Sequence, residues 1–319
     1  MSEIKIYKPN QLSYFMKNFG VYIGLIILLS ISGILSPQSF NPVGLLNVAK
    51  QTAGLGIVAI GQTMVILTGG IDLSVGSIIT FIHVFSIGTI LGNAQLVLPV
   101  SLFCLLLGLV FGFLNGLGIT KARISPFVMT LCMDFILRGL YLIYTKGQPR
   151  GIVPNNLRFI GRGRILNIVP VAFLIWIGIA FLFILVLYRT TWGARLYAVA
   201  ANSRTAQLSG VKNDTILMSV YALSGLLSAV AALVLTGDIG AVSLGLGRDY
   251  SLDSVAATVI GGTSFVGGIG GVEGTIAGAY IIKLLTSLLQ KINISNTGKL
   301  IIQGVLILFI VGAYSRKKN

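Results

Sequence analysis

Long apolar segments separated by short polar ones run along almost the whole chain. A helix needs about 20 mostly apolar residues to cross the hydrocarbon core of a bilayer. Segments of this kind lie at residues 19–36, 50–68, 76–92, 97–119, 126–145, 165–188, 214–236, 254–268, 273–290 and 299–314. The pattern predicts about ten transmembrane helices. The 254–268 segment is short and rich in glycine, so a broken or re-entrant helix is expected there.

Composition agrees with this pattern. Of the 319 residues 55% are hydrophobic and only 10% are charged, with a mean hydropathy of +0.93, whereas charged residues make up roughly a quarter of an ordinary soluble domain. A chain this apolar has too little polar surface to cover a water-soluble globule. We therefore expect an all-α polytopic membrane protein. The net charge of +15 is assigned to helix ends that face lipid headgroups, not to a nucleic-acid partner.

The distribution of lysine and arginine predicts the orientation. An even number of helices puts both basic termini on the cytoplasmic side, where positive charge accumulates. Residues 1–18 are then a cytoplasmic segment, 19–314 the transmembrane domain and 315–319 a cytoplasmic basic tail. The 146–164 loop opposes the rule, because it places five basic residues outside. It is interpreted as a docking surface for acidic groups of an external protein, or as a loop that contacts headgroups: Lys146, Arg150, Arg158, Arg162 and Arg164.

The chain lacks the groups that most membrane enzymes need. It has one histidine, His83, and eight acidic residues, with no HExxH pair and no cysteine cluster to hold a metal. It also lacks a P-loop sequence for binding ATP. We expect no catalytic residues, no metal and no cofactor bound by this chain, which leaves transport as the favoured class over scaffolding or an unusual enzyme.

A polar interruption at residues 67–77 separates two apolar segments. It reads Leu-Thr-Gly-Gly-Ile-Asp-Leu-Ser-Val-Gly-Ser and carries Asp72 and Ser74. Irregular backbone at membrane depth is tolerated only where protein or a water-filled cavity satisfies it. These two residues either cap the following helix or line a polar route. A related string at 235–239 ends a helix that runs in the opposite direction, as an inverted repeat requires.

Other polar residues fall within the predicted helices, where such residues usually face the protein interior or a cavity. Asp134 and Arg138 are four residues apart and are predicted to pair on one helix face, as a structural pair more than as a proton relay. His83 is expected to be a hydrogen-bonded packing residue. Small residues four apart predict close helix packing in two places: Gly108, Gly112 and Gly116, and Gly270, Gly274 and Gly278.

The longest polar segment on the cytoplasmic side covers residues 189–214. Asn202 or Ser203 can cap a short helix that runs through Leu208, and Gly210 can end it. Its small side chains alternate with Arg204 and Gln207. Such a helix fits the groove of a partner protein or lies flat at the membrane surface.

Several strings together resemble the permease subunits of the ribose-type branch of bacterial ABC sugar importers, from about residue 45 to the C-terminus. The chain departs from the pattern of this family in two places. Ala200-Ala201 stand near the position where the loop signature of the wider permease family has an acidic residue, and the single Pro126 stands where two prolines are usual. The strings are residues 69–77, Asn115-Gly116, Ser125-Pro126-Phe127, residues 193–211, residues 258–264 with Gly267-Gly268, and Gln303-Gly304.

The resemblance implies a fold of about ten helices, similar to that of vitamin B12 and siderophore permeases. It also implies that residues 189–214 form a cytoplasmic coupling loop that docks on an ABC ATPase, which binds and hydrolyses ATP. A second permease chain, identical or paralogous, and an extracytoplasmic sugar-binding protein complete the assembly. The coupling residues are then Asn202, Ser203, Arg204, Gln207, Leu208 and Gly210.

The function expected is translocation of a monosaccharide, ribose or a similar sugar, by alternating access. A neutral sugar suits a path with few fixed charges and many hydroxyl, amide and backbone groups. The candidates for the substrate pathway are Asp72, Ser74, Asn115 and Gln303. The alternative is an ion-coupled secondary transporter of a small polar solute, which needs a titratable group at mid-membrane, and His83 and Asp134 are the residues available for that role.

Overall fold

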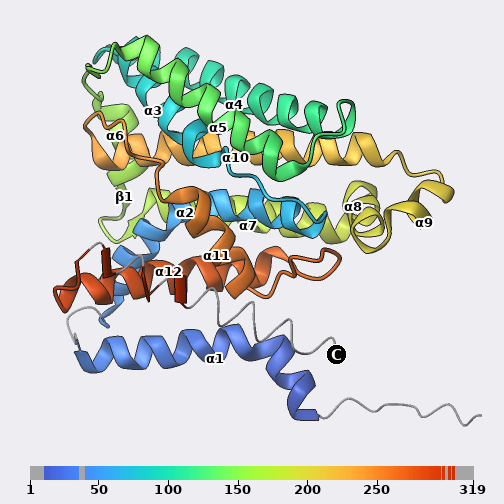
Figure 1. The fold of residues 1–319 in the computed structure, drawn as a ribbon. Helices are drawn as coiled ribbons and strands as arrows, with labels where there is room; N and C mark the ends of the chain where they lie inside the picture. The colour runs from blue at the N-terminus through green and yellow to red at the C-terminus, as the bar shows by residue number, and fades with distance from the viewer. Residues whose placement is uncertain (1–10, 36–39, 296, 299–300, 303, 306–319) are drawn as a thin grey trace, which may run out of the picture.

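The computed structural model describes residues 11–35, 40–295, 297–298, 301–302 and 304–305 (Figure 1). These residues are almost entirely helical, and within them one short hairpin pairs β1 with β2. The elements in chain order are α1 Gln11–Leu35, α2 Pro42–Leu67, α3 Val75–Ile90, the 3-10 helix η2 Ala94–Leu96, α4 Val97–Thr120, α5 Pro126–Thr145, α6 Asn155–Arg162, β1 Arg164–Ile165, β2 Val169–Pro170, α7 Val171–Arg189, α8 Thr191–Ala201, α9 Ser203–Leu208, α10 Asn213–Ile239, α11 Tyr250–Ile260 and α12 Val272–Lys291.

Every apolar segment predicted up to residue 290 contains a helix, but not every helix can cross a membrane. Among the described residues six helices are long and apolar enough: α2, α4 with η2, α5, α7, α10 and α12. The helices α3 and α11 have only 16 and 11 residues. By length and composition the described residues support six of the expected ten spans; 76–92 holds a shorter apolar helix, and 254–268 holds no full span, as expected. Most of the tenth predicted segment, 299–314, lies outside the described residues.

The helices α2 and α10 form the centre of the bundle and run antiparallel, as Figure 1 shows. Gly61 of α2 packs on Ser224 of α10. Toward the other end Lys50 forms an ion pair of 2.5 Å with Asp238. Most residues of both helices are buried. Because the two helices are antiparallel, the strings that suggest an inverted repeat, at residues 67–77 and 235–239, lie at opposite ends of this central pair.

Glycines bring α4 close to α10, as their four-residue spacing predicted. A Cβ atom at Gly112 would overlap the carbonyl oxygen of Tyr221, and one at Gly116 would lie 2.6 Å from the Cα of Met218. On α12, Gly274 and Gly278 pack against α11 in the same way. The third glycine of that predicted set, Gly270, does not share their helix face, because α12 begins only at Val272.

The order long helix, non-helical segment, short helix, long helix occurs twice. Residues 68–74 separate α2 from α3, and residues 240–249 separate α10 from α11. The starts of the two short helices meet: the Ser251 hydroxyl donates to the Leu73 carbonyl at 2.8 Å and accepts from the Gly76 amide at 3.1 Å. Because α2 and α10 are antiparallel, this duplicated order is what an inverted repeat produces.

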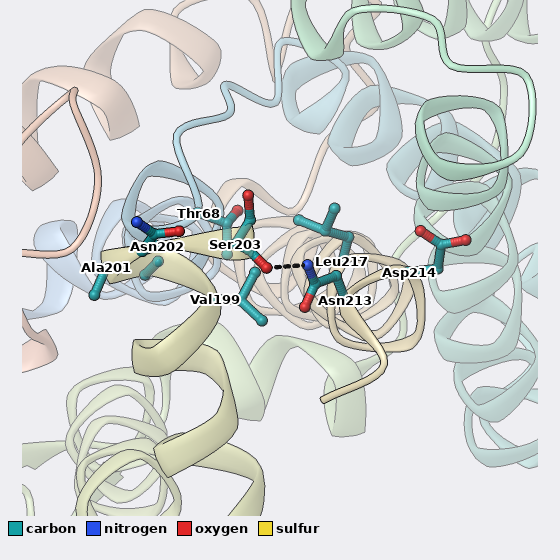
Figure 2. Close-up of a pocket in the computed structure, with 9 residues that line it drawn as sticks. Thr68, Val199, Ala201, Asn202, Ser203, Asn213, Asp214 and Leu217 are labelled. Carbon is teal, nitrogen blue, oxygen red and sulfur yellow. Dashed lines mark hydrogen bonds between the residues drawn. The ribbon is translucent and has the colours of Figure 1, made fainter. Parts of the chain in front are cut away.

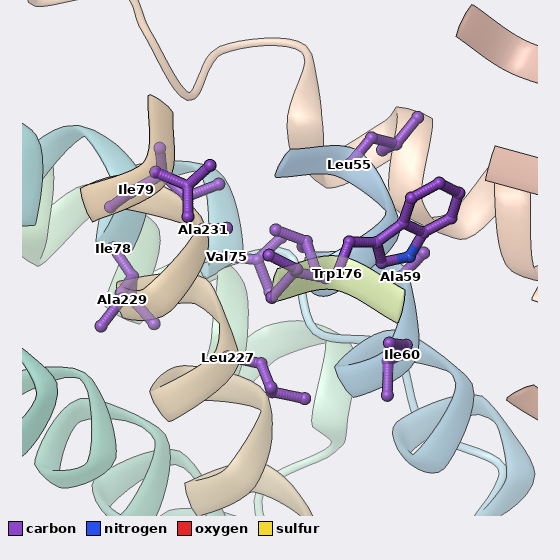
Figure 3. Packing of buried hydrophobic residues seen from close by; sticks show 14 of the residues in the cluster. Leu55, Ala59, Ile60, Val75, Ile78, Ile79, Trp176, Leu227, Ala229 and Ala231 are labelled. Atoms are coloured by element: carbon purple, nitrogen blue, oxygen red, sulfur yellow. The ribbon is translucent and has the colours of Figure 1, made fainter. Parts of the chain in front are cut away.

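Apolar side chains of α2, α3, α7 and α10 fill the space around the two central helices (Figure 3). Trp176 of α7 is almost fully buried and lies directly on Gly56 of α2, where a side chain larger than hydrogen would overlap its indole ring. This packing gives the non-helical segments a rigid frame.

Candidate transport site and coupling surface

Three of the four candidate pathway residues gather in one hydrogen-bonded cluster around Asp72. Ser74 donates to one Asp72 carboxyl oxygen from its amide at 3.0 Å and from its hydroxyl at 2.6 Å. The Ser224 hydroxyl of α10 donates to the other carboxyl oxygen at 2.8 Å. Asn115 of α4 donates from its side-chain amide to the Ser74 hydroxyl at 2.9 Å. The fourth candidate, Gln303, lies outside the described residues.

This cluster, called the Asp72 cluster below, sits near the middle of the bundle. The helix α10 has 27 residues, so its central residue is 226, and Ser224 lies about 3 Å from that level at 1.5 Å rise per residue. Asp72 is therefore held near mid-depth by a helix long enough to cross the membrane.

The Asp72 cluster satisfies the backbone where α2 gives way to α3. Asp72 accepts from the Ser74 amide just before α3, but Ser74, the N-cap residue, makes no side-chain bond to the first α3 amides, so the predicted side-chain cap is not formed. The Gln62 amide group, oriented to satisfy both partners, bonds the backbone nitrogen and oxygen of Asp72 at 3.2 Å each. Asp72, Ser74 and Asn115 have no exposed surface, so in this state the cluster is closed.

Residues 189–214, called the coupling segment below after the role expected for them, fold as the local sequence predicts. The Asn202 side chain accepts from the Thr205 amide at 3.0 Å, at the start of the six-residue helix α9. Gly210 follows with φ +83°, a left-handed conformation that favours glycine. The side chains of Arg204 and Gln207 are exposed, and Leu208, a large apolar residue, is 84% exposed. This helix therefore presents a polar face with one apolar tip to a partner or to solvent.

The turn between α8 and α9 is attached to α10 but does not pack tightly on it (Figure 2). Asn213 at the start of α10 donates to the Ser203 carbonyl at 2.7 Å. Beside this bond a cavity of about 620 Å³ separates the turn from α10, and Asn202, Ser203, Asp214 and Leu217 are among its lining residues. Leu196, Val199 and Ala206 of the same segment belong to the buried apolar cluster, so the segment is also anchored to the core by packing.

The basic 146–164 loop has internal partners that sequence reasoning missed. Arg162 donates to the carbonyls of Asp238 and Ile239, the latter at 2.9 Å. Arg158 donates to the Gly240 carbonyl at 3.4 Å. The last carbonyls of a helix lack intrahelical partners, so α6 caps the end of α10. No local signal predicts this, because donor and acceptor are separated by about 80 residues.

The remaining intramembrane polar residues behave as predicted. Arg138 and Asp134 form an ion pair at 2.8 Å. His83 accepts from the Ser243 amide at 3.1 Å through Nε2, so Nδ1 carries the proton and donates to Thr236 at 2.8 Å. His83 is therefore a packing residue that fastens residues 240–249 to α3. No group of three His, Cys, Asp or Glu side chains placed to hold a metal occurs among the described residues.

Comparison of the sequence with known proteins identifies its family. Residues 44–311 match the family described as branched-chain amino acid transport system/permease component. The ribose import permease protein RbsC of Bacillus subtilis is 39% identical, with 95% of this chain and 94% of the relative covered. The galactose/methyl galactoside import permease protein MglC of Escherichia coli is 31% identical, with 98% of each chain covered.

A third relative, the autoinducer 2 import system permease protein LsrC of Yersinia enterocolitica, is 32% identical, with 91% of this chain and 80% of the relative covered. No solved structure matches the chain. Because the family matches most of the sequence and six of the described helices are long and apolar enough to cross a membrane, the chain belongs to the branched-chain amino acid and sugar family of ABC importer permeases, as a non-catalytic, multi-pass inner-membrane subunit whose ATPase is a separate protein.

Proposed function

We propose that this permease imports a monosaccharide, ribose or a similar sugar, by alternating access. The names of its relatives support a sugar or a similar small solute, since they describe import of ribose, galactose and autoinducer 2. The observation that carries the proposal is a continuous connection. The helix α10 begins beside the exposed coupling segment and holds the Asp72 cluster at its middle.

The coupling segment is bonded to both halves of the repeat. In α8 the Trp192 indole donates to the Ser219 hydroxyl of α10 at 2.9 Å. The Tyr197 hydroxyl, also in α8, donates to the Gly270 carbonyl just before α12 at 2.9 Å. A displacement of α8 and α9 therefore pulls on the inner ends of α10 and α12 together. The ATPase drives transport only if its contacts differ between the two states of the permease.

The proposal places residues 189–214 and both termini in the cytoplasm. Two ATPase subunits or domains dock on the coupling segments of two permease chains, identical or paralogous, and a sugar-binding protein delivers substrate outside. Asp72, Ser74 and Asn115 are proposed to face the sugar route, together with Gln303, in a state in which the Asp72 cluster opens. The closed cluster then acts as a seal in the state described here.

Charge reversal on α9 tests the docking assignment. Arg204→Glu and Leu208→Glu alter exposed side chains, so both variants are expected to purify as folded, monodisperse protein. We expect ATPase co-purification and ATP-driven sugar uptake to fall at least tenfold. Arg123→Glu, an exposed charge reversal in the turn between α4 and α5, is the matched control. Normal ATPase capture and uptake by both α9 variants would overturn the assignment.

A further inference from the structure

Another polar cavity, of about 350 Å³, lies where the two short helices meet. It is bordered by α3, by α5, by the start of α11 and by the non-helical segment that leads into α11, and it is partly open to the surface. Polar side chains of its walls include Ser77, Thr80, Asp134, Arg138, Tyr141 and Arg248. The cavity is separate from the Asp72 cluster, whose residues are fully buried.

The floor of the cavity is the contact between the starts of α3 and α11. There the Gly247 amide donates to the Thr80 hydroxyl at 3.0 Å, next to the Ser251 bonds described above. On the other side of this floor lies the Asp72 cluster, since the Ser77 hydroxyl donates to the Ser74 carbonyl at 2.9 Å. On α5, Asp134 and Arg138 flank the helix centre. The cavity is therefore close to mid-depth and adjoins the seal.

The small hydroxyl groups of the cavity donate to the backbone, but its larger polar groups are available to a ligand. The Arg248 guanidinium and the Tyr141 hydroxyl have no hydrogen-bond partner in the described part of the chain. Arg138 contacts Asp134 through Nε at 2.8 Å, which leaves its two terminal nitrogens free to donate. Charged groups at membrane depth are costly and usually mark a ligand or ion pathway.

We propose that this cavity is the sugar-binding site of the permease during translocation. The inference rests on the proposed function and adds the residues that contact the substrate. Arginine forks donate paired hydrogen bonds to neighbouring oxygens, as adjacent sugar hydroxyls present. The Asp134 carboxyl group accepts from a sugar hydroxyl, and the Tyr141 ring offers an apolar face with a polar tip.

Volume and charge narrow the ligand class. Ligand pockets usually measure about 300–1,000 Å³, so a cavity of about 350 Å³ fits a single sugar ring and not a longer oligosaccharide. Two arginines against one aspartate give the walls a net positive charge, which disfavours a cationic solute. The ligand expected is an oxygen-rich monosaccharide that carries no positive charge.

The test uses the complete transporter in proteoliposomes, with permease, ATPase and binding protein, and radiolabelled D-ribose as the probe. Arg248→Gln changes an exposed side chain and is expected to lower uptake at least tenfold. Tyr141→Phe keeps the shape of the ring and is expected to lower uptake two- to fivefold. ATPase capture, binding-protein capture and ATP hydrolysis stay unchanged in both. Arg150→Gln in the outer loop, which does not line the cavity, is the control and imports normally.

The results distinguish a failure of the sugar-site assignment from a failure of the proposed function. If the wild-type transporter imports ribose and both variants do so at the same rate, the cavity is not on the route, and the proposed function stands. If the wild-type transporter imports neither ribose nor galactose, the proposed function itself fails. If Arg248→Gln weakens capture of the binding protein, Arg248 belongs to a docking surface, and its assignment to the sugar site is overturned.

Discussion

Replacing Asp72 by asparagine and by leucine separates a structural role of its carboxyl group from a role of its charge. Asparagine keeps an oxygen that accepts from the Ser74 amide and hydroxyl. Its amide nitrogen meets the Ser224 hydroxyl, which is able to turn and accept a hydrogen bond. Leucine removes all three bonds to the carboxyl group and leaves three buried donors without an acceptor.

The structure gives an order of magnitude for each change. A buried polar group left without a partner costs about 1–3 kcal/mol, so Asp72→Leu loses roughly 3–9 kcal/mol. That is comparable with a typical total stability of about 5–15 kcal/mol. Ser224→Ala removes a single bond to the carboxyl group and costs about 2 kcal/mol. Asp72→Asn is expected within about 1 kcal/mol of the wild type.

Thermal unfolding of the detergent-purified permease measures this order, with uptake measured in parallel. Asp72→Leu should accumulate poorly, Ser224→Ala should unfold at a reduced temperature, and Asp72→Asn should match the wild type and still import sugar. An Asp72→Leu variant as stable as the wild type would refute the reasoning. A folded Asp72→Asn variant that imports no sugar would show that transport needs the charge of the Asp72 carboxyl group.

Two pairs of substitutions test the glycine packing and the Asp134–Arg138 ion pair by the same unfolding assay. Gly112→Leu should unfold at a clearly lower temperature, because a Cβ atom at residue 112 overlaps α10. The control Gly139→Leu should unfold near the wild-type temperature, because no atom lies within 4 Å of its Cβ position. Equal effects of the two substitutions would contradict the close packing of α4 on α10. Arg138→Gln leaves the buried Asp134 carboxyl group without its ion partner and should cost about 1–3 kcal/mol. Asp134→Asn should cost less, because the Arg138 side chain is 50% exposed and stays hydrated; the reverse order would contradict the burial described.

Local signals account for what the sequence predicted well. The α9 cap at Asn202 and the left-handed Gly210 depend on neighbouring residues, so the short helix α9 was predictable with its bounds. The pair Asp134 and Arg138 likewise follows from a spacing of four on one helix. Helix existence followed from apolar length alone, since each long span reads as a continuous apolar segment.

Long-range contacts account for what could not be predicted. Apolar length cannot distinguish a helix that crosses the membrane from one that starts at mid-depth. The sequence therefore predicts a full span at 76–92, where the structure has a helix of 16 residues. The contact of Gly76 with Ser251 joins residues 175 positions apart, and no periodicity in either segment encodes it. The Arg162 contacts with the end of α10 are similar. The internal contacts of this basic loop could not be predicted for the same reason.

The central claim is that this chain imports a sugar with energy supplied by a separate ATPase. The most direct measurement is uptake of radiolabelled D-ribose by proteoliposomes that contain the permease, its ATPase and its binding protein. We expect ribose accumulation that requires ATP and the binding protein. We expect no accumulation when a proton or sodium gradient is imposed without the ATPase. Gradient-driven accumulation by the permease alone would contradict the claim.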